Sequence, residues 1–169
     1  MSVINNFNFV SLGSLGDPDD YRPDSYISFN VDPGENGKRV EQMVVFRERI
    51  APGDQIPLHR HTMEEVMMVD KGVIQARIGE NEHTAREGSV IFIPGLALHG
   101  FKNIGTEIAQ ITAVFPSRHV DICYEGRNPA PGTENDAPQP PVNIDVRALA
   151  EGDLKNAVEE VSKDRFEQK

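Results

Sequence analysis

The regular alternation of short apolar runs with turn residues is the feature that most constrains the fold of this chain. The 14 Gly and 12 Pro of the 169 residues lie between these runs, a pattern typical of short strands joined by turns. The expected strands are residues 26–31, 40–50, 65–69, 73–78, 89–93, 99–102 and 108–115. The turn signals are Asp32-Pro33-Gly34, Asn36-Gly37, Pro52-Gly53 and Lys71-Gly72. This spacing predicts an all-β domain, either a sandwich or a barrel.

Size and charge limit the class of protein. A chain of 18.8 kDa is expected to form one domain. Its 27 acidic and 17 basic side chains give a net charge of -10, which repels phosphate backbones and anionic lipids, so no nucleic acid and no membrane partner is expected. No apolar run approaches the roughly 20 residues of a membrane helix, and no signal pattern opens the chain, so a cytoplasmic location is predicted. The single cysteine, Cys123, excludes an internal disulfide.

The last third of the sequence changes character. Residues 126–141 carry five prolines and almost no core-forming side chains, which predicts an extended linker. Beyond it, Asp153 is a candidate N-cap for a short amphipathic helix that packs on the outside of the domain. The apolar stripe of this helix would be Leu154, Ala157, Val158 and Val161. We therefore expect a β domain with N-terminal strands at 1–125, a Pro-rich linker at 126–141 and a helical tail at 142–169.

Histidines close in sequence give the strongest chemical signal. Alternate residues of a strand share a face, so His59 and His61 bring two imidazoles within reach of one cation. Glu65 begins the next apolar run and can return a carboxylate oxygen to the same point. Its rival Glu64 has the opposite parity and is expected to be solvated or paired with Arg60. The remaining histidines differ in setting: His99 starts a strand, whereas His83 and His119 lie in polar surroundings that predict surface positions.

The order of these residues resembles the two motifs of the cupin superfamily. The first motif is matched at Gly53, His59, His61, Glu65 and Gly72, and the second at Gly88, Pro94, His99 and Asn103. Leu96 stands where the family has a glycine, which puts the local turn in question. The resemblance implies a cupin-type jelly-roll β-barrel with a metal deep inside, held by His59, His61, Glu65 and His99.

The donor set indicates the kind of metal. Three imidazoles and one carboxylate suit a divalent transition metal and leave coordination positions open. We expect one such ion per chain, Fe, Mn, Ni or Zn, with Fe favoured. Without a cation, several inward polar groups would be buried unpaired.

The stretch from Pro52 to Val66 is also similar to that of the plant auxin-binding proteins, cupins that hold zinc and a small aromatic carboxylate. This chain lacks their secretory signal, paired cysteines, tryptophans and retention tail. The likeness therefore supports the metal ligands rather than hormone binding.

Strand parity also suggests which residues line a substrate pocket around the metal. The pocket residues expected on this basis are Phe46, Met67, Val69 and Phe101. The same parity turns Glu48 inward as a candidate general base. The alternative is a surface glutamate on an edge strand, paired with Arg47 or Arg49.

These residues favour a metal-dependent enzyme that acts on a small oxygenated organic acid or on a diketone- or catechol-like molecule, with a dioxygenase as the first choice. An isomerase, lyase or decarboxylase would use the same ligands. A metal-dependent module that binds a small carboxylate or sugar without turnover is the other alternative. The runs 66–69 and 90–93 are apolar at both parities, which predicts strands covered on both faces and hence a homodimer.

Overall fold

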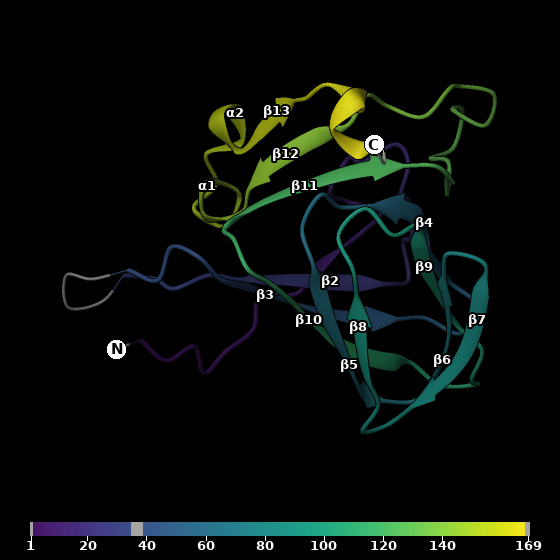
Figure 1. Cartoon of the computed structure of the whole chain (residues 1–169). Helices are drawn as coiled ribbons and strands as arrows, with labels where there is room; N and C mark the ends of the chain where they lie inside the picture. The colour runs from purple at the N-terminus through teal and green to yellow at the C-terminus, as the bar shows by residue number, and fades with distance from the viewer. Residues whose placement is uncertain (1, 35–38, 168–169) are drawn as a thin grey trace.

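The computed structural model describes residues 2–34 and 39–167 and consists mainly of two antiparallel β-sheets. The sheets face each other as the walls of a jelly-roll β-barrel, and only short helices accompany them (Figure 1). The all-β cupin-type fold predicted from the sequence is therefore confirmed. The turn predicted at Asn36-Gly37 lies outside the described residues.

One wall of the barrel is a six-stranded sheet with the order β1-β2-β3-β10-β5-β8. Its strands are β1 (Val10–Ser11), β2 (Tyr26–Asn30), β3 (Val44–Ile50), β5 (Glu65–Lys71), β8 (Val90–Ile93) and β10 (Ala109–Phe115). Apart from the two-residue β1, these strands overlap predicted runs, although β3 begins at Val44 rather than at residue 40, because alternating or continuous apolar residues mark strands with a buried face. The central pairing joins β3 to β10 over seven residues, from Val44 opposite Phe115 to Ile50 opposite Ala109.

The other wall is a seven-stranded sheet with the order β13-β12-β11-β4-β9-β6-β7. Its strands are β4 (Gln55–Arg60), β6 (Val73–Ile78), β7 (Asn81–Arg86), β9 (His99–Asn103), β11 (His119–Tyr124), β12 (Val142–Asp145) and β13 (Val158–Glu160). His83 lies in β7 and is exposed, as its polar surroundings predicted. This strand sits at the edge of the sheet and is almost entirely exposed, so its polar sequence carries no apolar period.

The C-terminal segment forms more strand than predicted. Helix α1 (Val146–Ala150) is capped by Asp145, whose side chain accepts hydrogen bonds from two backbone N–H groups, and α2 (Leu154–Ala157) follows. The predicted helical stripe ends there, because Val158 begins β13 and pairs with Ile144 of β12. These elements lie above β11 at the top of Figure 1. The division into domain, linker and tail stays a prediction, although β12 and β13 extend the barrel sheet.

Two apolar clusters hold the barrel walls together. The larger one includes Ile50, Val69, Ile74 and Ala109, and the smaller one is built around Val44, Phe115 and Val146. Burial of such side chains is the main favourable contribution to folding. Among the described residues, no helix is long and apolar enough to cross a membrane.

Candidate metal centre

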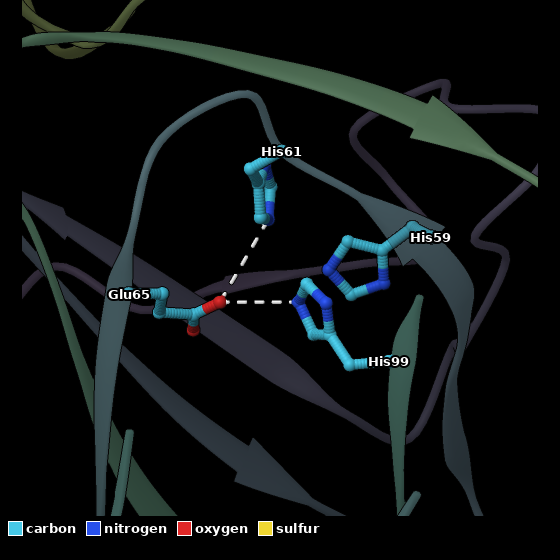
Figure 2. A group of neighbouring side chains, drawn as sticks. All are labelled: His59, His61, Glu65 and His99. Carbon is cyan, nitrogen blue, oxygen red and sulfur yellow. Dashed lines mark ion pairs between the residues drawn. The ribbon is translucent and has the colours of Figure 1, made fainter. Parts of the chain in front are cut away.

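Four side chains converge inside the barrel from both walls. His59 lies on β4, His61 directly follows this strand, Glu65 opens β5 and His99 opens β9. Within the seven-stranded sheet, His59 is the register partner of His99. The four residues are buried, and their ligand atoms all lie within 4.8 Å of one another. Figure 2 shows the four side chains turned toward a common point.

Hydrogen bonds to backbone carbonyls fix the orientation of all three imidazoles. Nδ1 of His59 lies 2.7 Å from the carbonyl oxygen of Pro57, and Nδ1 of His99 lies 2.7 Å from that of Ala97. Nδ1 of His61 contacts the carbonyl oxygen of Asp121. A carbonyl only accepts hydrogen bonds, so each Nδ1 carries the proton and each Nε2 presents a lone pair. This tautomer leaves each Nε2 free to bind a metal.

Burial keeps the histidine pair in the neutral form. It lowers the pKa of His59 well below its ordinary value, and the neighbouring imidazoles of His99 and His61 lower it further. Burial also lowers the pKa of His61, against the opposing effect of the Glu65 carboxylate. Neutral imidazoles are the form that coordinates metals.

The atoms that face the centre lack partners of their own. Oε2 of Glu65 and Nε2 of His99 are buried and have no hydrogen-bond partner among the described residues. Such orphaned polar atoms are costly inside a protein unless a cation or water satisfies them. The donor set of three imidazole nitrogens and one carboxylate oxygen fits a divalent transition metal, and the four-residue group could hold one.

The turn at Gly95 and Leu96 is hydrogen-bonded to the segment that carries His61. Leu96 adopts a left-handed conformation with φ of 67°, so it takes the conformation for which the family motif has a glycine. Its N–H donates to the carbonyl of His61 at 2.7 Å, and its own carbonyl accepts from Arg60 at 2.8 Å. A Cβ on Gly95 would lie 2.6 Å from the carbonyl oxygen of Thr62. The turn therefore accommodates leucine in place of the motif glycine, and the two hydrogen bonds of Leu96 hold it in this conformation.

A cavity of about 410 Å³ extends from the centre. Of the predicted pocket residues, Phe46, Met67 and Phe101 line it. Val69 is not among the lining residues, so its place in a substrate pocket stays a prediction. Val69 shares the buried face of β5 with Met67 and is the register partner of Ile111 on β10.

Glu48 also lines the cavity, as strand parity predicted. Its strand β3 lies between β2 and β10, so the alternative of an edge strand was wrong. Its ion-pair partner is Arg22, at 3.1 Å, rather than either arginine beside it in the sequence. Burial raises the pKa of Glu48, and the charge of Arg22 partly offsets that rise.

Several cavity residues come from segments that the sequence motifs do not include. Arg22 holds Asp20 through two contacts of 2.7 and 2.6 Å, and the Tyr124 hydroxyl donates to Asp17 at 3.1 Å. Segments near both ends of the chain contribute to the lining, among them Leu15 and Ile144. The N-terminal residues carry no periodic pattern, so no signal in the sequence assigned them to the site. Glu64, the rival of Glu65 for the carboxylate role, is exposed.

Comparison with known families finds one match, over the middle of the chain. Residues 46–115 match the family described as a cupin domain, and this stretch contains all four converging residues together with Glu48. Over these residues the chain is similar to a cupin domain. A search of curated protein sequences found no match, so the likeness to auxin-binding proteins stays a resemblance.

Solved structures show the same architecture. A polyketide cyclase from Streptomyces resistomycificus is 17% identical with a TM-score of 0.55, and the match covers 69% of this chain and 79% of that one. An RmlC-like cupin from Shewanella frigidimarina is 14% identical with a TM-score of 0.51, covering 69% and 90%. A sugar phosphate isomerase of the cupin superfamily from Silicibacter pomeroyi is 19% identical with a TM-score of 0.52, covering 83% and 77%. At these identities the likeness shows the fold alone.

Proposed function

We propose that this cupin is a metal-dependent enzyme that binds one divalent transition metal through His59, His61, Glu65 and His99. The observation that carries the proposal is the convergence of three Nε2 lone pairs and one carboxylate oxygen within 4.8 Å, beside a cavity. Four protein ligands leave open positions for substrate in an octahedral site. Iron is the metal we favour, with manganese, nickel and zinc as the alternatives.

The substrate we propose is a small oxygenated organic acid, diketone or catechol-like molecule. A metal in this site would polarise the substrate oxygens and, if it is iron, allow reaction with O₂. The side chains of the cavity have two further roles. Phe46, Met67 and Phe101 exclude water, and Glu48 presents a carboxylate to the substrate. The Oε2 atom of Glu48 binds Arg22, and no described residue donates to its Oε1, which leaves this atom free to accept a substrate proton.

Dioxygenase chemistry is our first choice because a histidine-rich site with open positions suits Fe(II). Isomerase, lyase or decarboxylase chemistry on the same substrates needs only the polarising effect of the metal and a base, and Glu48 would supply the base. A binding module without turnover would need no base at all. The inward position of Glu48 favours an enzyme over such a module. The predicted cytoplasmic location would be checked by fractionating cells that contain the protein.

The test combines metal analysis with two separate activity readouts. Protein purified without chelators is analysed for metal, and the iron-, manganese-, nickel- and zinc-loaded forms are offered oxo acids, diketones, catechols and uronates. Oxygen uptake and product formation are followed independently. We expect product from at least one class, with oxygen consumed by the iron form. Product without oxygen uptake would replace the dioxygenase by an isomerase, lyase or decarboxylase.

A pair of glutamate variants tests the role of the base. Glu48→Gln should lower turnover at least tenfold, because general-base catalysis typically contributes 10² to 10⁴ in rate, while metal content stays unchanged. Glu64→Gln is the matched control, since Glu64 is exposed and should retain full turnover. Binding of substrates with no turnover in the wild type, together with unchanged affinity in Glu48→Gln, would support the binding module instead.

We also propose that the protein is a homodimer that covers the outer face of β8. This strand is an edge of the six-stranded sheet, and its Phe92 and Val90 side chains are 74% and 51% exposed. Exposed apolar residues on an unpaired edge favour association. Light scattering at micromolar concentration should give twice the chain mass, and Phe92→Arg should give the monomer. A monomeric wild type would contradict this proposal.

A further inference from the structure

The charges around the cavity are unequally distributed. Five carboxylates are among the residues that line it, those of Asp17, Asp19, Asp20, Glu48 and Glu65. Within the described part of the chain, no lysine or arginine is a lining residue. The rest of the wall is largely apolar and includes four phenylalanines, Phe29, Phe46, Phe101 and Phe115.

The two arginines nearest to these carboxylates are already engaged by protein groups. Arg22 is 2% exposed, and its guanidinium binds both Asp20 oxygens and Glu48. Arg127 binds Asp19 and donates further hydrogen bonds to three backbone carbonyls and to the hydroxyl of Thr133. Neither guanidinium is therefore available to receive an anionic ligand, because each would first have to leave a buried partner.

The remaining charge balance disfavours an anion in the cavity. Five carboxylates against two guanidinium groups leave a formal charge of -3 when all are ionised, and a divalent metal would reduce it to -1. Burial raises the pKa of Asp17, and the nearby charges of Asp20 and Asp19 contribute to this rise. A ligand carboxylate would meet the same desolvation and the same repulsion.

The polar atoms that remain available are mainly hydrogen-bond acceptors. Oε1 of Glu48 receives no hydrogen bond from the described residues. The hydroxyl of Tyr124 already donates its proton to Asp17, so it can only accept a further hydrogen bond. A ligand O–H group can donate to such atoms, but a carboxylate cannot. The cavity of about 410 Å³ lies within the range of pockets that hold drug-sized ligands, and its phenylalanines suit a ring or an alkyl chain.

From this arrangement we infer that the cavity selects an uncharged, largely apolar molecule with adjacent oxygen atoms, a catechol or an enolised diketone, and rejects carboxylates. The inference rests on the proposed metal site, because the adjacent oxygens are the atoms that would bind there. It narrows the proposed substrates to their neutral members. An O–H group of the ligand donates to Glu48, and its apolar part lies against the phenylalanines.

Binding of two matched probes tests the selection independently of turnover. The probes are 4-methylcatechol and 3,4-dihydroxybenzoate, which share the catechol oxygens and differ by a methyl group against a carboxylate. Calorimetric titration into the zinc-loaded protein at neutral pH avoids redox reaction. We expect the neutral probe to bind at least tenfold more tightly. Equal binding, or tighter binding of the benzoate, would overturn the inference.

A gain-of-charge variant separates electrostatics from shape. Leu15 lines the cavity and is 39% exposed, so Leu15→Lys should fold and place a cation at the cavity. We expect it to reduce the preference for the neutral probe at least threefold. Leu154→Lys is the control, because Leu154 is 67% exposed and lies outside the cavity lining. Leu15→Gln controls for the lost apolar contact, and an equal change in this variant would contradict the electrostatic origin.

The two proposals fail in different ways. Selective binding of the neutral probe with no turnover of any substrate would overturn the enzyme and leave the selectivity in place. Turnover of carboxylate substrates alone would overturn the selectivity and leave the enzyme in place. If the protein takes up none of the four metals, the proposed metal site is wrong. The neutral probe should then also lose its affinity.

Discussion

Nε2 of His99 lies 3.2 Å from Oε2 of Glu65, yet neither atom has a hydrogen-bond partner among the described residues. The His99 proton is directed to the carbonyl of Ala97 through Nδ1, so two lone pairs face each other in a buried site. A cation between them would turn this repulsion into attraction. Figure 2 shows that the other two imidazoles approach the same point.

Loss of a single ligand should remove the metal and destabilise the fold. His99→Ala is expected to lower metal content severalfold and to reduce the melting temperature to that of chelator-treated protein. A metal that binds only the folded state adds about 2.7 kcal/mol when its free concentration is about 100 times Kd. Elemental analysis and thermal unfolding measure both effects.

His83→Ala provides the control for this loss, because His83 is exposed on β7. It should keep full occupancy and an unchanged melting temperature. Full occupancy in His99→Ala as well would exclude His99 as a ligand.

The stability of metal-free protein should fall as the pH is lowered below about 6.5. Burial lowers the folded-state pKa of His59 well below that of the unfolded chain, so in this window the unfolded chain takes up a proton that the native state does not. Acidification therefore favours unfolding until His59 itself is protonated in the fold.

The difference between wild type and His59→Gln isolates this contribution from the raised pKa of Glu48, which acts in the opposite direction. The pH slope of the unfolding free energy should decrease in the variant by up to about 1.4 kcal/mol per pH unit. Chemical denaturation with chelator present measures the slopes. Identical slopes for the two proteins would show that His59 does not cause this pH dependence.

A methyl group at Gly95 should disturb the metal centre through the backbone. In Gly95→Ala the new Cβ would lie 2.6 Å from the carbonyl oxygen of Thr62, which sits between His61 and Glu65. We expect a loss of about 1–3 kcal/mol in stability, as for overpacking in general, and weaker metal binding. In Gly105→Ala the nearest contact is a milder 3.3 Å, to Oδ1 of Asn103, so this variant should lose less. An equal loss of stability and metal affinity in the two variants would contradict a steric effect of the Gly95→Ala Cβ on the metal centre.

Removal of the Arg22 charge should be strongly destabilising. Arg22→Gln leaves Asp20 and Glu48 buried without their cation, and breaking a buried ion pair in this way costs about 3–5 kcal/mol. Adding Glu48→Gln should recover part of the loss, because one of the two uncompensated charges then disappears. Urea unfolding of both proteins measures the recovery. A double variant no more stable than Arg22→Gln would show that Arg22 does not act through this charge pair.

The candidate metal residues were predictable because their spacing is local. Strand geometry puts His59 and His61 on one face, and the short turn that follows returns Glu65 to them. The cupin motif spacing added His99. The same strand period puts Glu48, Phe46 and Met67 on the faces that line the cavity, and puts Val69 on the buried face of β5 without reaching the lining.

The sequence by itself determined the all-β class, most strands of the six-stranded sheet and the candidate ligands His59, His61 and Glu65, since these depend on residues a few positions apart, while the motif resemblance added His99. Only the tertiary structure decided that Arg22 pairs with Glu48 across 26 positions and that Tyr124 reaches Asp17 across 107. It also decided that Val158 extends a sheet edge instead of a helix, because pairing with Ile144 satisfies backbone groups that one helical turn would leave open. Contacts between distant segments leave no period in the sequence, so the charge of the cavity wall emerges only from the fold.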